Sequence, residues 1–189
     1  RNRYLSNPKH PNVFIAKAVV FEGPEDYHKR LNNKKLKIDE NSILIIRGCG
    51  PVGYPGSAEV INMQPPDRLL KKGINTLPTL GDGRQSGTSA SPSILHVSPE
   101  SAVGGDLGIV KTGDKIKIDL NKRRVDLLIS QSEFKNRRKK RKKFKINNQT
   151  PWQEIFRDTV GQLEDGACIK SRGIYLKVST SKGIPRDSH

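Results

Sequence analysis

The sequence predicts a loop-rich α/β or mostly β domain rather than a helical bundle. Its 189 residues suffice for one ordinary domain with a hydrophobic core and are too few for two large ones. Hydrophobic residues make up only 33%, while 17 glycines and 12 prolines indicate many turns and much irregular backbone. Twice, a short apolar run leads into a glycine-rich turn and then into a helical segment, which favours sheet and helix together.

Two strands are expected in the first quarter of the chain. Residues 13–21 are rich in β-branched and aromatic residues and stop at Gly23, after which a short helix is expected over 24–33. Residues 42–47 (SILIIR) form a continuous apolar run, which is typical of a strand buried on both faces. This run leads directly into a glycine-rich turn at 48–53.

The next segment repeats this order of an apolar strand followed by a glycine-rich loop. Residues 77–80 (LPTL) are expected to form a short strand that enters the loop GDGRQSGTS at 81–89, with a helix after it. Before this strand, helical pieces are expected at 58–62 and 67–72. A Pro-Pro pair stands between the two pieces and forbids one continuous helix.

The second half of the chain predicts a hairpin followed by helices. Residues 109–120 alternate between apolar and charged side chains around a Gly-Asp turn and predict a half-buried strand, with 124–130 as its hairpin partner. Ser132 is expected to cap a helix that carries a run of basic residues. A last helix is expected over 151–163, with Trp152 holding it in the core.

The net charge of +16 invites a nucleic-acid function, but the charge is concentrated in one block. Nine of the eleven residues in Lys135–Lys145 are basic. We interpret this block as a solvated helix face or an interdomain surface. The alternative is a patch for nucleic acid or an acidic membrane, with Phe134 and Phe144 flanking the charges. No nucleic-acid motif accompanies the block and aromatic residues make up only 5%, so nucleic acid is not expected as a partner.

Two cysteines, Cys49 and Cys168, are too few for a disulfide framework or an all-cysteine metal site. Reduced thiols and a cytoplasmic location, or a mitochondrial one in a eukaryote, are therefore expected. The sequence contains no apolar run long enough to span a membrane and no signal-peptide pattern. Because it opens on Arg1, the sequence is interpreted as a segment of something longer.

The loop GDGRQSGTS is the strongest candidate for a binding site. Its three glycines permit a close backbone approach to a ligand, and Ser86, Thr88 and Ser89 follow where a helix can begin and bind an anion. It matches neither the phosphate-binding P-loop nor the nucleophile elbow of hydrolases. A tight loop with a Ser/Thr helix cap remains an equal interpretation of these residues. Glu59 brings a carboxylate near the same loops, but one carboxylate does not define a magnesium site. From the residues alone, a solvated surface Glu is the favoured interpretation.

Several long segments resemble one enzyme family. AVVFEGPEDYH (18–28), RGCGPVGYPGSAEVINMQPPD (47–67), the 29 residues from Leu77 to Gly105 and QTPWQEIFRDTVGQL (149–163) closely resemble the C-terminal region of the dihydroxy-acid and sugar-acid dehydratases. The resemblance is nearest to the aldonate dehydratases that act on arabonate and xylonate. It covers almost the whole chain and includes the final PRDSH, where Asp187 departs from the family's PRHSH.

The resemblance implies a fold, a reaction and cofactors. The expected fold is an α/β domain on a mixed β-barrel of the swivelling type, flanked by helices. The family removes water from a 2,3-dihydroxy carboxylate to give a 2-keto-3-deoxy acid, using a 2Fe-2S cluster and Mg²⁺. Ser86 falls on the serine that takes the C2 proton, and Glu59 on a Mg²⁺ ligand. Thr88 and His189 fall on substrate-contacting positions.

The resemblance also implies a division of the enzyme. Residues 1–130 would form the barrel with its active-site loops, and residues 131–189 a helical extension packed on it. The N-terminal domain with the cluster ligands would be absent from this sequence, so the segment alone is expected to be inactive. Expected partners are that domain, a sugar-acid substrate and further copies in a homodimer or homotetramer, with no membrane. The alternatives are a branched-chain dihydroxy-acid dehydratase and a non-catalytic fragment that binds a polyanion.

Overall fold

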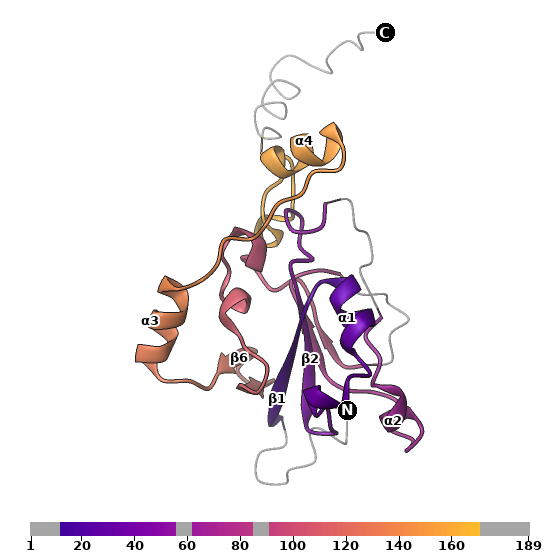
Figure 1. Cartoon of the computed structure of the whole chain (residues 1–189). Helices are drawn as coiled ribbons and strands as arrows, with labels where there is room; N and C mark the ends of the chain where they lie inside the picture. Colours follow the sequence, from indigo (N-terminus) through magenta and orange to yellow (C-terminus); the bar gives the residue numbers. More distant parts are fainter. Residues whose placement is uncertain (1–11, 56–61, 85–90, 171–189) are drawn as a thin grey trace, which may run out of the picture.

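A computed structural model describes residues 12–55, 62–84 and 91–170, which form one mixed sheet with α-helices around it (Figure 1). The strands follow the order β4-β3-β2-β1-β5-β6 across the sheet. Strands β1 to β4 are parallel, β5 is antiparallel to β1, and β6 is antiparallel to β5. The strand bounds are β1 (Val13–Glu22), β2 (Ser42–Arg47), β3 (Thr79–Gly81), β4 (Ser93–Ile94), β5 (Lys115–Asp119) and β6 (Arg124–Leu127).

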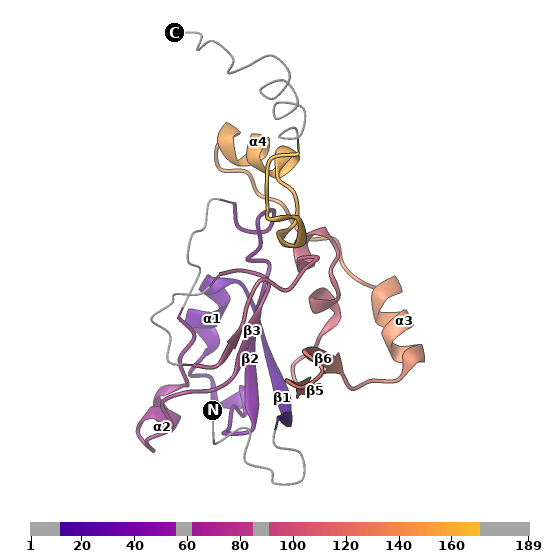
Figure 2. The ribbon, with the colours of Figure 1, turned by 180° about the vertical axis from the view of Figure 1, so that it is seen from behind.

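The sheet curls into half of a barrel and is flanked by four α-helices in the described residues. Helices α1 and α2 lie on one side of the sheet, α3 lies on the other, and α4 lies beyond one end (Figures 1 and 2). The helix bounds are α1 (Pro24–Arg30), α2 (Asp67–Leu70), α3 (Gln131–Lys139) and α4 (Pro151–Thr159), with 3-10 turns η1 (Lys34–Leu36), η2 (Ser101–Val103), η3 (Asp106–Ile109) and η4 (Leu163–Asp165). The α/β fold with a mixed, curled sheet is confirmed.

Strand β2 is buried on both faces, as its apolar run predicts. Leu44 and Ile46 pack in the cluster beneath α1 and α2, whereas Ile43 and Ile45 pack in a second cluster on the inner face of the curl. All four side chains are at most 2% exposed. Truncating Ile45 to Ala would therefore cost about 3 kcal/mol of stability.

The hairpin after the parallel strands is confirmed, but its first strand is shorter than expected, because residues 109–114 form the end of η3 and a turn and not a strand. The helix after the hairpin also differs from the expectation. Ser130, and not Ser132, is the N-cap of α3, and its side chain accepts a hydrogen bond from the Glu133 N–H. The helix ends at Lys139, so the second half of the basic run is not helical. Unpaired lysines on successive turns repel one another, and this opposes a longer helix.

The expectation that Trp152 holds the last helix in the core is wrong. Helix α4 begins at Pro151 and is capped by Thr150, but the Trp152 side chain is 77% exposed. Ile155 on the same helix is also more than half exposed. The contact that ties α4 to the sheet end is polar, because the guanidinium of Arg157 donates to the carbonyl of Val52 at 2.8 Å.

Candidate functional site

The two glycine-rich loops leave neighbouring parallel strands at the same edge of the sheet. Leu44 to Ile46 of β2 pair with Thr79 to Gly81 of β3, so the turn that begins at Gly48 and the loop that begins at Asp82 start side by side. Ligands of α/β sheets characteristically bind at this carboxyl edge. The first residues of the two loops are therefore neighbours at the edge of the sheet where a ligand site is expected.

Asp82 joins the two loops. Its fully buried carboxylate accepts hydrogen bonds from the backbone N–H groups of Gly48 at 3.0 Å and Cys49 at 2.9 Å. The N–H and hydroxyl of Ser101, at the start of η2, also donate to it, at 2.9 and 2.5 Å. A buried carboxylate is tolerated only where donors surround it, and here four donors do so.

Glu100 likewise binds backbone N–H groups further along the turn that begins at Gly48. It too is fully buried, and its carboxylate accepts from the N–H groups of Val52 at 2.9 Å and Gly53 at 2.8 Å. The side-chain amide of Gln162 donates to the same carboxylate at 2.9 Å and accepts from the Glu100 N–H at 2.9 Å. Glu100 therefore connects the glycine turn of β2 to the segment after α4.

Gly83 shows why the loop after β3 needs glycine. A Cβ atom at this position would lie 2.6 Å from the Cys49 carbonyl oxygen and 2.7 Å from the Cys49 Cβ. Real Cβ atoms do not approach other atoms so closely, so any side chain here would push the two loops apart. The absence of a side chain at Gly83 thus permits close contact with the neighbouring loop, while the close approach to a ligand expected of this loop stays a prediction.

Cys49 is buried, and the pKa of its thiol is raised, mainly by burial and secondarily by the negative charge of Asp82. The protonated form of the thiol is therefore favoured.

A hollow of about 260 Å³ lies where the loops meet. Tyr54 and Arg84 are among the residues that line it, together with Cys49, Asp82 and Phe156. Arg84 directly precedes residues 85–90, and Tyr54 comes two positions before residues 56–61. The chain therefore enters both segments that carry the predicted catalytic residues from the wall of this hollow.

The four predicted site residues lie outside the described residues. They are Glu59, Ser86, Thr88 and His189. Their roles stay predictions. The helix expected after the loop GDGRQSGTS is wrong for the described residues, because the chain from residue 91 onward enters strand β4 and pairs with β3. Within the described ranges there is no group of three His, Cys, Asp or Glu side chains that could hold a metal ion. The described part of the chain also has no helix long and apolar enough to cross a membrane.

Sequence reasoning missed the two carboxylates that hold the loops. Asp82 was interpreted only as part of a ligand loop, and Glu100 only as part of a family motif. One signal was available for Asp82, since an acid between two glycines directly after a buried strand must itself be buried and must find backbone donors. Glu100 offers no such signal, because its donors lie 47 to 62 residues away in the sequence.

Comparisons with known proteins agree with the resemblance seen in the sequence. The chain is 53% identical over all of its 189 residues to a D-xylonate dehydratase of Caulobacter vibrioides, of which it covers 31%. It is 39% identical over 183 residues, 95% of its length, to an L-arabinonate dehydratase of Rhizobium leguminosarum bv. trifolii, covering 30% of that protein. A dihydroxy-acid dehydratase of Thermodesulfovibrio yellowstonii is 38% identical over 158 residues, which are 83% of this chain and 28% of that protein.

The chain thus spans less than a third of the length of these curated relatives. The profile described as dihydroxy-acid/6-phosphogluconate dehydratase C-terminal matches residues 5–167, which include both glycine loops and both buried carboxylates. By this match and by its similarity to sugar-acid dehydratases, the chain belongs to the dihydroxy-acid/6-phosphogluconate dehydratase family and corresponds to its C-terminal region.

Proposed function

We propose that the full-length protein is a hydro-lyase that dehydrates a sugar acid to a 2-keto-3-deoxy acid, and that this chain supplies the base. The observation that carries the proposal is the 53% identity to a D-xylonate dehydratase over the whole chain. The dihydroxy-acid dehydratase named above matches less of the chain, at 38% identity. An aldonate is therefore favoured over a branched-chain dihydroxy acid as the substrate.

In this proposal Ser86 removes the proton at C2 and the C3–O bond breaks, so that a proton and a hydroxide leave overall as water. The enol that remains tautomerises to the 2-keto-3-deoxy acid. Thr88 and His189 contact the substrate. Glu59 is the Mg²⁺ ligand that this chain contributes, and the other Mg²⁺ ligands and the 2Fe-2S ligands lie outside it. When bound, Mg²⁺ and the cluster would supply positive charge that acidifies the C2 proton and stabilises the departing hydroxide. A free serine is a poor base, so Ser86 requires a strongly positive environment.

The described loops support the proposal through their rigidity. Asp82 and Glu100 together accept seven hydrogen bonds, five from backbone N–H groups at the start of the loops and η2 and two from side chains. These bonds fix the points where the chain enters 56–61 and 85–90. A base and a metal ligand act efficiently only when their supports are fixed in this way, since small displacements of the reacting groups reduce the rate steeply.

The test is turnover by the full-length protein with an intact cluster. A panel of aldonates, including xylonate and arabonate, is compared with 2,3-dihydroxyisovalerate. Turnover of an aldonate with a kcat/KM well above that for dihydroxyisovalerate is expected, and the reverse order would favour the dihydroxy-acid alternative. Ser86→Ala is expected to reduce kcat by about 10³-fold or more. The purified 189-residue chain is expected to be inactive. Unchanged dehydration by Ser86→Ala would remove the proposed base.

A further inference from the structure

A basic segment, residues 140–145, runs from the end of α3 toward α4 and is here called the basic strap. It has neither helix nor strand, and all six of its residues are exposed. Figure 1 shows it as the orange chain that leaves α3 and passes along the sheet end. The arginines and lysines around it make very different contacts, and this difference indicates what the strap does.

The arginines bind the protein itself. Arg137 forms a two-bond ion pair with Asp114, at 2.5 and 3.0 Å, and also donates to the carboxylate of Glu133. Arg138 pairs with Asp106 at 2.7 Å, and Arg141 donates to the carbonyl oxygen of Gly104. The three guanidinium groups therefore hold the end of α3 and the start of the strap on the structure.

The two aromatic residues that flank the charges also contact other parts of the protein. The Phe134 ring lies under the Arg138 guanidinium at 5.3 Å. The Phe144 ring lies against Gly48, where a Cβ atom would come within 2.7 Å of it. The Phe134 ring is covered by a guanidinium, and Phe144 is 38% exposed, so the two rings do not form a pair of open stacking surfaces for successive bases.

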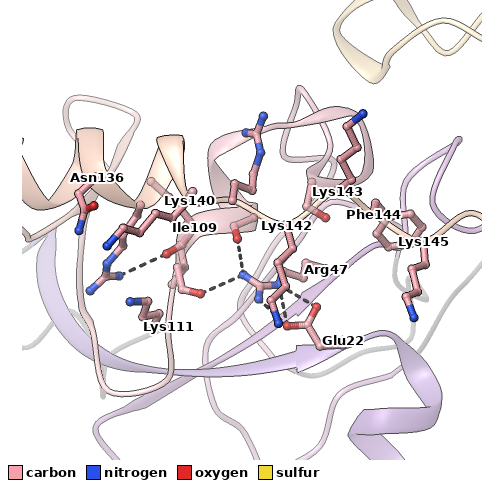
Figure 3. A pocket seen from close by; sticks show the side chains of 15 residues that line it. Glu22, Arg47, Ile109, Lys111, Asn136, Lys140, Lys142, Lys143, Phe144 and Lys145 are labelled. Carbon is pink, nitrogen blue, oxygen red and sulfur yellow. Dashed lines mark hydrogen bonds and ion pairs between the residues drawn. The ribbon is translucent and has the colours of Figure 1, made fainter.

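A hollow of about 530 Å³ lies beneath the strap, between it, η3 and the end of β2. Eight cationic side chains line it against one carboxylate, that of Glu22, which pairs with Arg47. Figure 3 shows Lys142 reaching down beside the Arg47–Glu22 pair, Lys145 on one side of it and Lys140 on the other. The ammonium of Lys143 points away from the pair in the same view.

Three of the lysines of this hollow lack carboxylate partners among the described residues. Arg47, Arg137 and Arg141 are bound to internal acceptors, and Lys111 lies 3.8 Å from Glu133. No ion pair is formed by Lys140, Lys142 or Lys145 with any described carboxylate. Three uncompensated ammonium groups are thus held around one hollow by a strap that is itself fixed in place.

We propose that this hollow binds a short phosphate chain, such as the triphosphate of a nucleotide or inorganic tripolyphosphate, through Lys140, Lys142 and Lys145. Separate ammonium groups match several negative charges spaced along a chain better than they match one carboxylate. The hollow is also large enough for a ligand of that size. The site does not depend on the proposed dehydratase activity and is tested without it.

The experiment is a calorimetric titration of the full-length protein, without added Mg²⁺, using sodium tripolyphosphate, ATP and orthophosphate. Tripolyphosphate and ATP are expected to bind with similar affinity, and orthophosphate about tenfold or more weakly, since it offers fewer charges. Affinity for tripolyphosphate is expected to fall about tenfold between roughly 50 and 300 mM NaCl. Binding of ATP without binding of tripolyphosphate would overturn the proposal, because the phosphate chain would not be what is recognised.

The charge-matched variants locate the site. Lys140→Gln/Lys142→Gln/Lys145→Gln is expected to weaken tripolyphosphate binding about tenfold, whereas Lys34→Gln/Lys71→Gln/Lys72→Gln, which removes the same charge near η1 and α2, changes it less than about twofold. Within the strap, Lys142→Gln is expected to weaken binding more than Lys143→Gln.

Equal losses in the two triple variants would overturn the proposal in favour of attraction by net charge alone. The proposal would also be overturned if an oligonucleotide bound far more tightly than tripolyphosphate, with an affinity that increases with its length. That result would identify the strap as a nucleic-acid surface. Circular dichroism melts check that each variant is folded.

Discussion

The buried carboxylate of Asp82 accepts a hydrogen bond from the backbone N–H of Cys49 at 2.9 Å, so the loop after β3 holds the loop after β2. In the sequence, the first loop leads into the segment of the proposed Mg²⁺ ligand and the second into the segment of the proposed base. Because the hydrogen bond connects loops and not strands, its loss should affect the arrangement of the site as well as the stability of the sheet end.

Asp82→Asn tests this connection. An Asn side chain offers one acceptor oxygen and an amide that faces N–H donors, so backbone groups that now bind Asp82 would stay buried without partners. We expect a loss of roughly 3 kcal/mol in stability and a fall in kcat, measured by denaturant unfolding and turnover of the full-length protein. Asp165→Asn, at an exposed position in η4, is the control and should leave both unchanged. Equal unfolding midpoints for the two variants would contradict the role given to Asp82.

Gly83→Ala tests the close approach of the same loops. The added methyl group would meet the Cys49 carbonyl oxygen at 2.6 Å, so the backbone must move. We expect a cost of about 2 kcal/mol, measured as a lower thermal midpoint. Gly108→Ala is the matched control, because a Cβ there would lie 3.5 Å from its nearest neighbour, an ordinary contact. A Gly83→Ala protein as stable as Gly108→Ala would show that the loops separate easily.

Arg137→Lys tests how α3 is held. Arg137 and Asp114 are each about 10% exposed in their side chains, and a lysine cannot form the two parallel bonds of the guanidinium. We expect a loss of roughly 2 kcal/mol, read from denaturant unfolding. Arg138→Lys changes a pair with Asp106 that is about half exposed, and should cost under about 0.5 kcal/mol. The opposite ranking of the two variants would refute the assignment of Arg137 as the stabilising contact.

The strands were predictable where local pattern and burial agree. The apolar run of β2 and the alternation of Ile116 and Ile118 in β5 need no distant partner to be recognised, and both are found as expected. The strand expected at 77–80 is displaced to Thr79–Gly81, because its bounds are set by pairing with β2 and not by its own residues.

The contacts that organise the candidate site were not predictable in the same way. Glu100 reaches donors in the β2 turn and in the segment after α4, and the sequence separation hides both. Trp152 was placed in the core because large aromatic residues are usually buried, whereas here its helix leaves that face open. The family resemblance pointed to Glu59 and Ser86, but the bonds that fix their loops are visible only in the fold.

The pKa of the Cys49 thiol gives the last prediction, a pH dependence of stability. Burial raises this pKa, so the thiol stays protonated in the folded protein, while in the unfolded chain it ionises near pH 8.5, roughly the value of a free cysteine. The unfolded state therefore loses a proton that the folded state keeps, and stability falls as the pH rises above about 8.5, by at most about 1.4 kcal/mol per pH unit. Denaturant unfolding of the wild type and of Cys49→Ala between pH 7 and 10 measures this effect. The difference in stability between the two proteins should be constant below about pH 8 and shrink above it. A constant difference up to pH 10 would show that the Cys49 thiol ionises equally well in both states.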